Sequence, residues 1–249
     1  MKKGMLKELI KDLNKLAKPQ KAKDLAWFFK TGKGEYGEGD KFLGIMVPEQ
    51  RKLVKKYYMD ISLPEVQKIL DSKFHEFRLT GVLILVEKYQ SLNKGDLKEE
   101  RLKKEICDLY LRNLKKGRIN NWDLVDLSAP KILGDYFFDK KKNLLYNLVT
   151  SKNLWERRVA VLSTFYFIRK KDFKDALKIF ELLLKDKEDL IHKAVGWGLR
   201  EIGKREQTIL INFLNKFTSV MPRTMLRYAI EKFKEENIQK YLLISKDKI

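Results

Sequence analysis

Apolar residues recur every three or four positions along almost the whole chain, in blocks of 10 to 18 residues separated by short polar breaks. This spacing is that of amphipathic helices, each of which buries one face. Only five Pro and 13 Gly occur, so the turn signals that an all-β fold needs are scarce. The pattern predicts helices over 4–17, 21–30, 48–58, 63–71, 74–89, 96–115, 120–132, 135–149, 153–168, 172–185, 189–203, 205–217 and 222–243. Each helix boundary is defined to within about 2 to 4 residues.

Local signals mark several ends of these helices. Two segments, 62–65 (SLPE) and 153–156 (NLWE), have the form of capping boxes, in which the first and fourth side chains satisfy amides of the first turn. Pro48 and Pro222 suit the first helical position, where the missing N–H costs nothing. Glycines near the ends of apolar blocks predict helix ends at Gly117, Gly134 and Gly203.

The second half of the chain is periodic. Helix starts at 120, 153, 189 and 222 are separated by 33, 36 and 33 residues, and a second helix lies between successive starts. A helix pair about every 35 residues is typical of HEAT or armadillo repeats. The spacing therefore predicts an all-α, curved α-solenoid with the first helix of each pair on its concave face, and a compact irregular bundle is the alternative.

Charge points to a polyanionic partner. The chain holds 54 Lys and Arg against 34 Asp and Glu, a net charge of +20. Such a surplus disfavours a compact state by self-repulsion unless an anion lies against it, and nucleic acid is the leading candidate. The alternative is a Lys-rich proteome that raises the charge of every protein. Hydrophobic residues make up 44% of the chain, so a disordered basic tail is excluded.

Few residues are available for disulfides or metals. Cys107 is the single cysteine, which excludes a disulfide framework and fits a reducing compartment. His75 and His192 are the two histidines and cannot by themselves form a zinc site, so we expect no metal and no cofactor. No apolar run approaches the roughly 20 residues of a membrane span. We expect a soluble cytoplasmic protein that is monomeric and makes no contact with a membrane.

The segment 31–40 (TGKGEYGEGD) interrupts the helical pattern with four glycines. It lacks the Lys-Ser/Thr ending of a phosphate-binding loop and follows no strand, so a Walker motif is excluded. We expect a flexible loop with Tyr36 at its centre. Although the length allows two domains, we expect one repeat domain over 1–249, with a helical hairpin and this loop in 1–40 and the array in 41–243.

The first helices of the pairs carry the residues of most chemical interest. Trp122 and Asp126 are four residues apart and so share one face of a helix. Most tryptophans at helical spacing belong to a core, and we expect this of Trp27 and Trp155. Asp123 is better placed than Asp126 to interact with the helix dipole. Other members of this set lie on the later first helices: Arg158, Lys193, Trp197, Arg200, Arg223 and Arg227.

A carboxylate in a basic groove would repel DNA phosphates, so a role other than phosphate binding must account for its presence there. Between two indole rings, Asp126 would suit a cationic target, because indoles attract cations by about 0.5 to 2 kcal/mol. A cationic group on a polyanion suggests an alkylated purine.

Six segments, in order along the chain, carry a specific resemblance. They are 42–51 (FLGIMVPEQR), 75–78 (HEFR), 120–126 (NNWDLVD), 155–160 (WERRVA), 189–201 (DLIHKAVGWGLRE) and 221–230 (MPRTMLRYAI). Together they resemble the motifs of the AlkD-type DNA alkylation repair family, from about Leu25 to Phe233.

The resemblance implies HEAT-like repeats that wrap duplex DNA containing alkylated purines, on a concave basic face, and hence association with the nucleoid. It also implies a monofunctional glycosylase that releases N3- and N7-alkylated purines in base excision repair. The family's catalytic residues fall on Trp122, Asp126 and Trp197. Its groove arginines fall on Arg158 and Arg200, with further phosphate contacts expected from Lys193, Arg223 and Arg227, and Tyr36 is carried over as a DNA contact.

Two other classes of function compete with this interpretation. A non-catalytic repeat scaffold would bind damaged or branched DNA without releasing bases. A helical-repeat adaptor would use the same basic face for an acidic protein and would not need Trp122 or Asp126.

Overall fold

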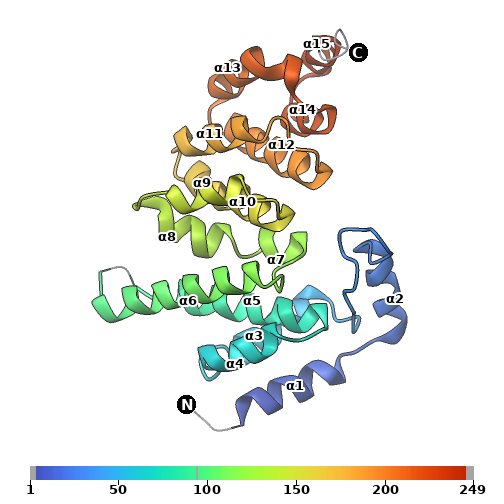
Figure 1. Ribbon diagram of the computed structural model, residues 1–249, viewed down its shortest axis with the longest axis vertical. Helices are drawn as coiled ribbons and strands as arrows, with labels where there is room; N and C mark the ends of the chain where they lie inside the picture. Colours follow the sequence, from blue (N-terminus) through green and yellow to red (C-terminus); the bar gives the residue numbers. More distant parts are fainter. Residues whose placement is uncertain (1–3, 94, 245–249) are drawn as a thin grey trace. The chain divides into compact units, whose positions relative to one another are not determined.

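The computed structural model describes residues 4–93 and 95–244, and every regular element in these ranges is helical (Figure 1). The predicted all-α fold class is confirmed. The chain divides into two compact units, Met1–Ile132 and Leu133–Ile249. The single repeat domain therefore stays a prediction, and each unit is described by itself. In the described ranges no helix is both long and apolar enough to cross a membrane.

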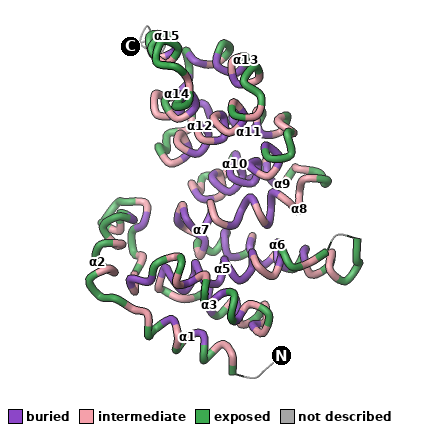
Figure 2. Tube along the Cα trace, turned by 180° about the vertical axis from the view of Figure 1, so that it is seen from behind, coloured by how far each residue is buried: buried purple, intermediate pink, exposed green. Residues whose placement is uncertain are grey.

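The first unit is built around one buried helix. Its helices are α1 (Met5–Lys15), α2 (Pro19–Phe28), α3 (Val47–Tyr57), α4 (Leu63–Leu70), α5 (His75–Gln90), α6 (Leu97–Lys115) and α7 (Trp122–Asp126). Helix α5 packs against α3, α4, α6 and α7, and nearly all of it is buried (Figure 2). Apolar residues occur all around α5, and the helix has no single polar face. This is expected of a helix that is covered on all sides.

The second unit repeats one arrangement of helix pairs. Its helices are α8 (Asp135–Phe138), α9 (Asn143–Val149), α10 (Leu154–Arg169), α11 (Lys174–Leu182), α12 (Asp189–Gly203), α13 (Gln207–Phe217), α14 (Arg223–Ile230) and α15 (Glu235–Ile244), with a 3₁₀ turn at Thr218–Val220. The first helices α10, α12 and α14 lie side by side, and α9, α11 and α13 pack beside them (Figure 1). The alternation predicted from the sequence period is present in this unit.

Glycines set the spacing of these first helices. A Cβ on Gly196 would lie 2.4 Å from the carbonyl oxygen of Met225, so α12 approaches α14 more closely than any side chain would allow. Gly134 stands in the same relation to Ser163, at 2.5 Å. The prediction that Gly134 ends a helix is wrong, because a π-helical segment (Pro130–Gly134) runs through it into α8. Its physical role is close packing.

Three predicted helices are interrupted. The helix over 120–132 ends at Asp126, because Pro130 has no N–H to donate to the carbonyl of Asp126. The helix over 135–149 breaks at 139–142, where the Lys142 ammonium group donates to the carbonyl of Phe138, 2.8 Å away, and closes α8. The helix over 222–243 divides into α14 and α15, and no breaker residue marks that division.

Three other predicted helix ends are confirmed, and a fourth is confirmed in part. At Ser62 the capping box is confirmed, since its N–H donates to Glu65 Oε2 at 2.8 Å and its hydroxyl accepts from the Glu65 N–H at 3.4 Å. At Asn153 only half of the box forms: its side chain accepts from Trp155 N–H at 2.8 Å, while its own N–H donates to the Ser151 hydroxyl. The ends at Gly117, with φ +69°, and Gly203 are confirmed.

Candidate active site and nucleic-acid interface

Helix α7 presents Trp122 and Asp126 on one face. The Asn121 side chain accepts a hydrogen bond from the Trp122 N–H at 2.9 Å and so starts the helix. Trp122 and Asp126 are both partly exposed, whereas Asp123, Leu124 and Val125 between them are buried. The expected sharing of one helix face is therefore present, and both side chains can be reached from solvent.

The indole of Trp122 is held by aromatic side chains from the N-terminal hairpin. Its ring stacks on Phe29, with centroids 5.1 Å apart and planes 12° from parallel. Phe28 meets it edge-on at 6.0 Å. Phe29 in turn stacks on Phe42 at 5.1 Å. One side of the indole is thus fixed by packing, which orients the part that remains exposed.

A buried polar network lies behind α7. His75 Nε2 is 2.8 Å from Asp123 Oδ2, and His75 Nδ1 is 3.3 Å from Asp40 Oδ2. The Arg78 guanidinium donates to the other oxygen of Asp40 at 2.7 Å. Burial alone would lower the pKa of His75, but the charge of Asp123 and hydrogen bonds to both carboxylates outweigh it and raise the pKa to about 9. The imidazole is therefore protonated at neutral pH and ties Asp40 to the first turn of α7.

Two further amides complete this network. The side chains of Asn120 and Asn121 donate to Asp40 at 3.2 and 3.4 Å. Asp40, the last residue of the glycine-rich segment, thus bonds to the starts of both α5 and α7. Sequence reasoning missed this network, because its hydrogen bonds join residues that are 35 to 81 positions apart.

Glu76, at the start of α5, fixes a neighbouring stretch of backbone. Its carboxylate accepts from the backbone N–H groups of Leu43, Gly44 and Ile45, at 2.8 to 3.2 Å. Glu76 is itself 1% exposed. These charge-assisted bonds fix the segment that links the glycine-rich loop to α3.

Internal hydrogen bonds organise the glycine-rich loop. Glu35 and Glu38 accept from the N–H groups of Gly32 and Gly34, both at 2.8 Å. A Cβ on Gly37 would lie 2.3 Å from the Phe29 carbonyl oxygen, so the loop packs closely on the end of α2. Tyr36 is partly exposed within this loop. Its DNA contact stays a prediction.

In the second unit, Trp197 lies on a partly exposed face of α12. Its ring meets buried Phe165 of α10 edge-on, with centroids 4.6 Å apart. Lys193 and Arg200 precede and follow it by four and three residues and so share its face. The second predicted indole is therefore anchored at one edge and accessible at another.

The five predicted phosphate-binding residues differ in exposure and in the partners that they have within the protein. Arg158 is 5% exposed and donates to the carbonyl of Leu190. Arg200 pairs with Glu231. Lys193 pairs with Asp189 at 2.7 Å, and Arg223 donates to the Leu242 carbonyl at 2.6 Å. Of the five, only Arg227 is classed as exposed, and the DNA contacts of all five stay predictions.

Two other tryptophans were expected in the core. Trp155 is 8% exposed, which confirms the prediction. The prediction for Trp27 is wrong, since this side chain is 83% exposed. The reason is that α2 buries none of its residues, and no helix among the described residues packs over Trp27.

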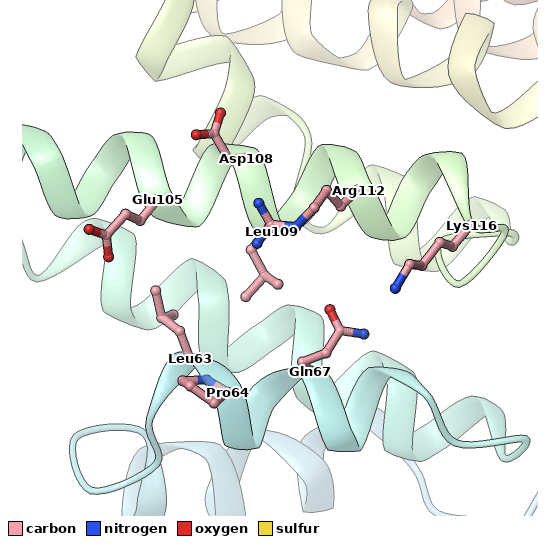
Figure 3. A pocket seen from close by; sticks show the side chains of 8 residues that line it. All are labelled: Leu63, Pro64, Gln67, Glu105, Asp108, Leu109, Arg112 and Lys116. Atoms are coloured by element: carbon pink, nitrogen blue, oxygen red, sulfur yellow. The ribbon is translucent and has the colours of Figure 1, made fainter.

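A hollow of about 500 Å³ separates α4 from α6 (Figure 3). Glu105 and Asp108 lie toward one end of α6, and Arg112 and Lys116 toward the other. None of the predicted site residues lines it. In the described ranges, no group of three or more His, Cys, Asp or Glu side chains is arranged to hold a metal ion.

Comparisons with known proteins give a family from the sequence and a fold from the structure. The family model described as DNA alkylation repair enzyme matches residues 9–233. A solved structure, described as a predicted DNA alkylation repair enzyme from Enterococcus faecalis, is 18% identical and superposes with a TM-score of 0.64. That match covers 88% of this chain and 97% of the other, and at this identity it shows the fold. A search of curated proteins found no match.

Proposed function

Because this chain belongs to the DNA alkylation repair enzyme family, we propose that it is a monofunctional glycosylase that releases N3- and N7-alkylated purines from duplex DNA. The observation that carries the proposal is the face of α7, where a partly exposed carboxylate lies one turn from a fixed, partly exposed indole. Asp126 is the last residue of α7, where the helix dipole disfavours negative charge. Helix stability therefore does not account for its carboxylate.

The chemistry needs little from the protein besides electrostatics. Alkylation at N3 or N7 gives the purine a positive charge, so it leaves without being protonated first. As the bond from C1′ to N9 breaks, its electron pair neutralises the purine and positive charge develops on the sugar. The Asp126 carboxylate stabilises that charge and orients a water molecule, whose oxygen bonds to C1′ and whose proton passes to solvent.

The two indoles strengthen this interaction. Trp122 and, as we propose, Trp197 pack against the deoxyribose of the lesion and exclude bulk water. In the resulting low-dielectric site, attraction between the carboxylate and the sugar cation is stronger than in water. The basic residues of α12 and α14 hold the flanking phosphates, with Arg227 the most accessible.

The deciding experiment measures bases released from methylated DNA. Purified protein is incubated with methylated duplex, and free 7-methylguanine and 3-methyladenine are separated by chromatography. We expect release of both without strand cleavage. Absence of any free base, with equal binding to damaged and undamaged duplex, would instead indicate the non-catalytic scaffold. Binding of acidic peptides as tightly as DNA would indicate the adaptor.

A further inference from the structure

Helix α2 presents an apolar surface that the chain leaves uncovered. None of its ten residues is buried. Trp27 is 83% exposed and Phe28 54%, and Met46, which precedes α3, is 41% exposed. These three side chains, which we call the α2 patch, line a hollow of about 630 Å³. Exposed apolar patches with polar residues around them mark binding sites on soluble proteins.

The fold holds this patch in place. At the start of α2, the Lys18 N–H donates to the Leu43 carbonyl at 2.8 Å, and a Cβ on Gly44 would lie 2.2 Å from the Lys18 carbonyl oxygen. At its end, buried Phe29 stacks on Phe42 and Trp122. Both ends of α2 are therefore anchored, and the indole of Trp27 faces solvent because of this anchoring rather than through fraying.

The surroundings of the patch favour a nucleic-acid ligand. Lys21 and Lys23 line the same hollow, and Asp24 is 3.6 Å from Lys21. Lys23 is exposed and forms no ion pair within the part of the chain that the structure describes. The patch is also continuous with the proposed active site, since Phe28 contacts the ring of Trp122. A ligand with flat apolar rings and phosphates matches both features.

We propose that the α2 patch stacks an unpaired DNA base, so that the protein binds distorted duplex more tightly than regular duplex. The inference rests on the proposed function only in taking DNA as the ligand. An indole can stack on the face of any base, and the lysines can pair with the adjoining phosphates. A regular duplex hides its base faces, which become available only where pairing or stacking is broken. The α2 patch therefore recognises unpaired or unstacked bases, and this binding is separate from the chemistry at Asp126.

The test compares two undamaged duplexes that differ by one extra unpaired nucleotide. Affinities of the full chain are measured by fluorescence anisotropy. For Trp27→Ala we expect about a 10-fold loss of affinity for the bulged duplex, because base–aromatic stacking is of this order, and less than about a two-fold loss for the paired one. Trp27→Phe keeps a ring and should retain most of the preference.

A matched control is available in the same unit. Leu97, at the start of α6, is 81% exposed, and Leu97→Ala removes a comparable exposed apolar group away from the patch. It should leave both affinities unchanged. Since Trp27 is largely exposed, the thermal unfolding midpoint of Trp27→Ala should equal that of the wild type, which separates lost stacking from lost folding.

Three results would overturn the inference. They are equal affinity of the wild type for both duplexes, an equal loss on both in Trp27→Ala, and no loss on either. A protein partner for the patch would give the last of these. Because these measurements use undamaged DNA and require no base release, failure of the glycosylase proposal would be seen separately, in the methylated-DNA assay.

Discussion

Asp123 and Asp126 are three residues apart on α7, yet their surroundings give them different uses. Asp123 is 5% exposed, and its oxygens bond to His75 and to the N–H of Leu124. Asp126 is partly exposed beyond the helix centre. Asp123 therefore has a structural role, whereas for Asp126 we propose a role in catalysis. Environment rather than residue type separates the two roles.

Asp126→Asn tests the electrostatic role. The amide has the same shape but no charge, so we expect release of 7-methylguanine to fall about 100-fold or more, the usual effect of removing one transition-state stabiliser. DNA affinity should change less than two-fold. Asp108→Asn, which removes a surface charge from α6, is the control and should release bases at the wild-type rate. Near-normal excision by Asp126→Asn would contradict the assignment.

His75 makes stability depend on pH. Its pKa rises from 6.5 in the unfolded chain to about 9 in the folded one, so its contribution is complete below pH 6.5 and is lost as pH rises through 9. We expect the free energy of unfolding to fall by roughly 3 kcal/mol across that range. Urea unfolding from pH 6 to 10 should show this fall in the wild type, and His75→Gln should flatten it. Equal slopes in both proteins would rule out His75 as the cause.

At the scale of elements, close contacts between helices depend on missing side chains. Gly196 lets α12 lie against the backbone of α14, and Gly198 makes room for Phe180 of α11, whose ring would be 2.4 Å from an added Cβ. Trp197, between these glycines, is therefore placed by contacts on both of its sides. The helix that carries the proposed second indole is therefore in close contact with both α14 and α11.

Gly196→Ala should separate α12 from α14. The obstructing atoms are the Met225 carbonyl oxygen and the Tyr228 Cβ, which cannot rotate away, so we expect a destabilisation of about 1 to 3 kcal/mol in urea unfolding. Gly203→Ala is the matched control: there the obstructing atom is a Leu210 methyl group that can move, and alanine favours the helix. Equal effects of the two substitutions would show that backbone proximity is not the constraint.

At the scale of the whole molecule, the net charge of +20 is the property that bears most directly on DNA. Lys and Arg neutralise phosphates and release counterions, so affinity should fall steeply as salt rises. Part of this charge is already engaged, because Arg158 and Arg200 are bound within the second unit. We therefore expect the slope of log affinity against log salt to indicate fewer phosphate contacts than the number of basic residues on the first helices.

Arg227→Gln tests this proposal. We expect weaker binding to all duplex sequences alike, and a slope of log affinity against log salt that is smaller in magnitude by about one. Lys178→Gln removes the same charge from an exposed position on the second helix α11 and should leave the slope unchanged. Identical slopes for Arg227→Gln and the wild type would exclude a phosphate contact at this residue.

The sequence by itself determined what depends on neighbours along the chain. Helical periodicity, the capping box at Ser62 and the spacing of Trp122 and Asp126 are local, so the fold class and the shared face of α7 could be predicted. Tertiary structure alone decided which helix faces find partners. It leaves Trp27 uncovered, closes Arg158 onto Leu190, and joins Asp40, His75 and Asp123 across 35 to 48 residues. Those contacts arise from packing between distant segments, which no local pattern encodes.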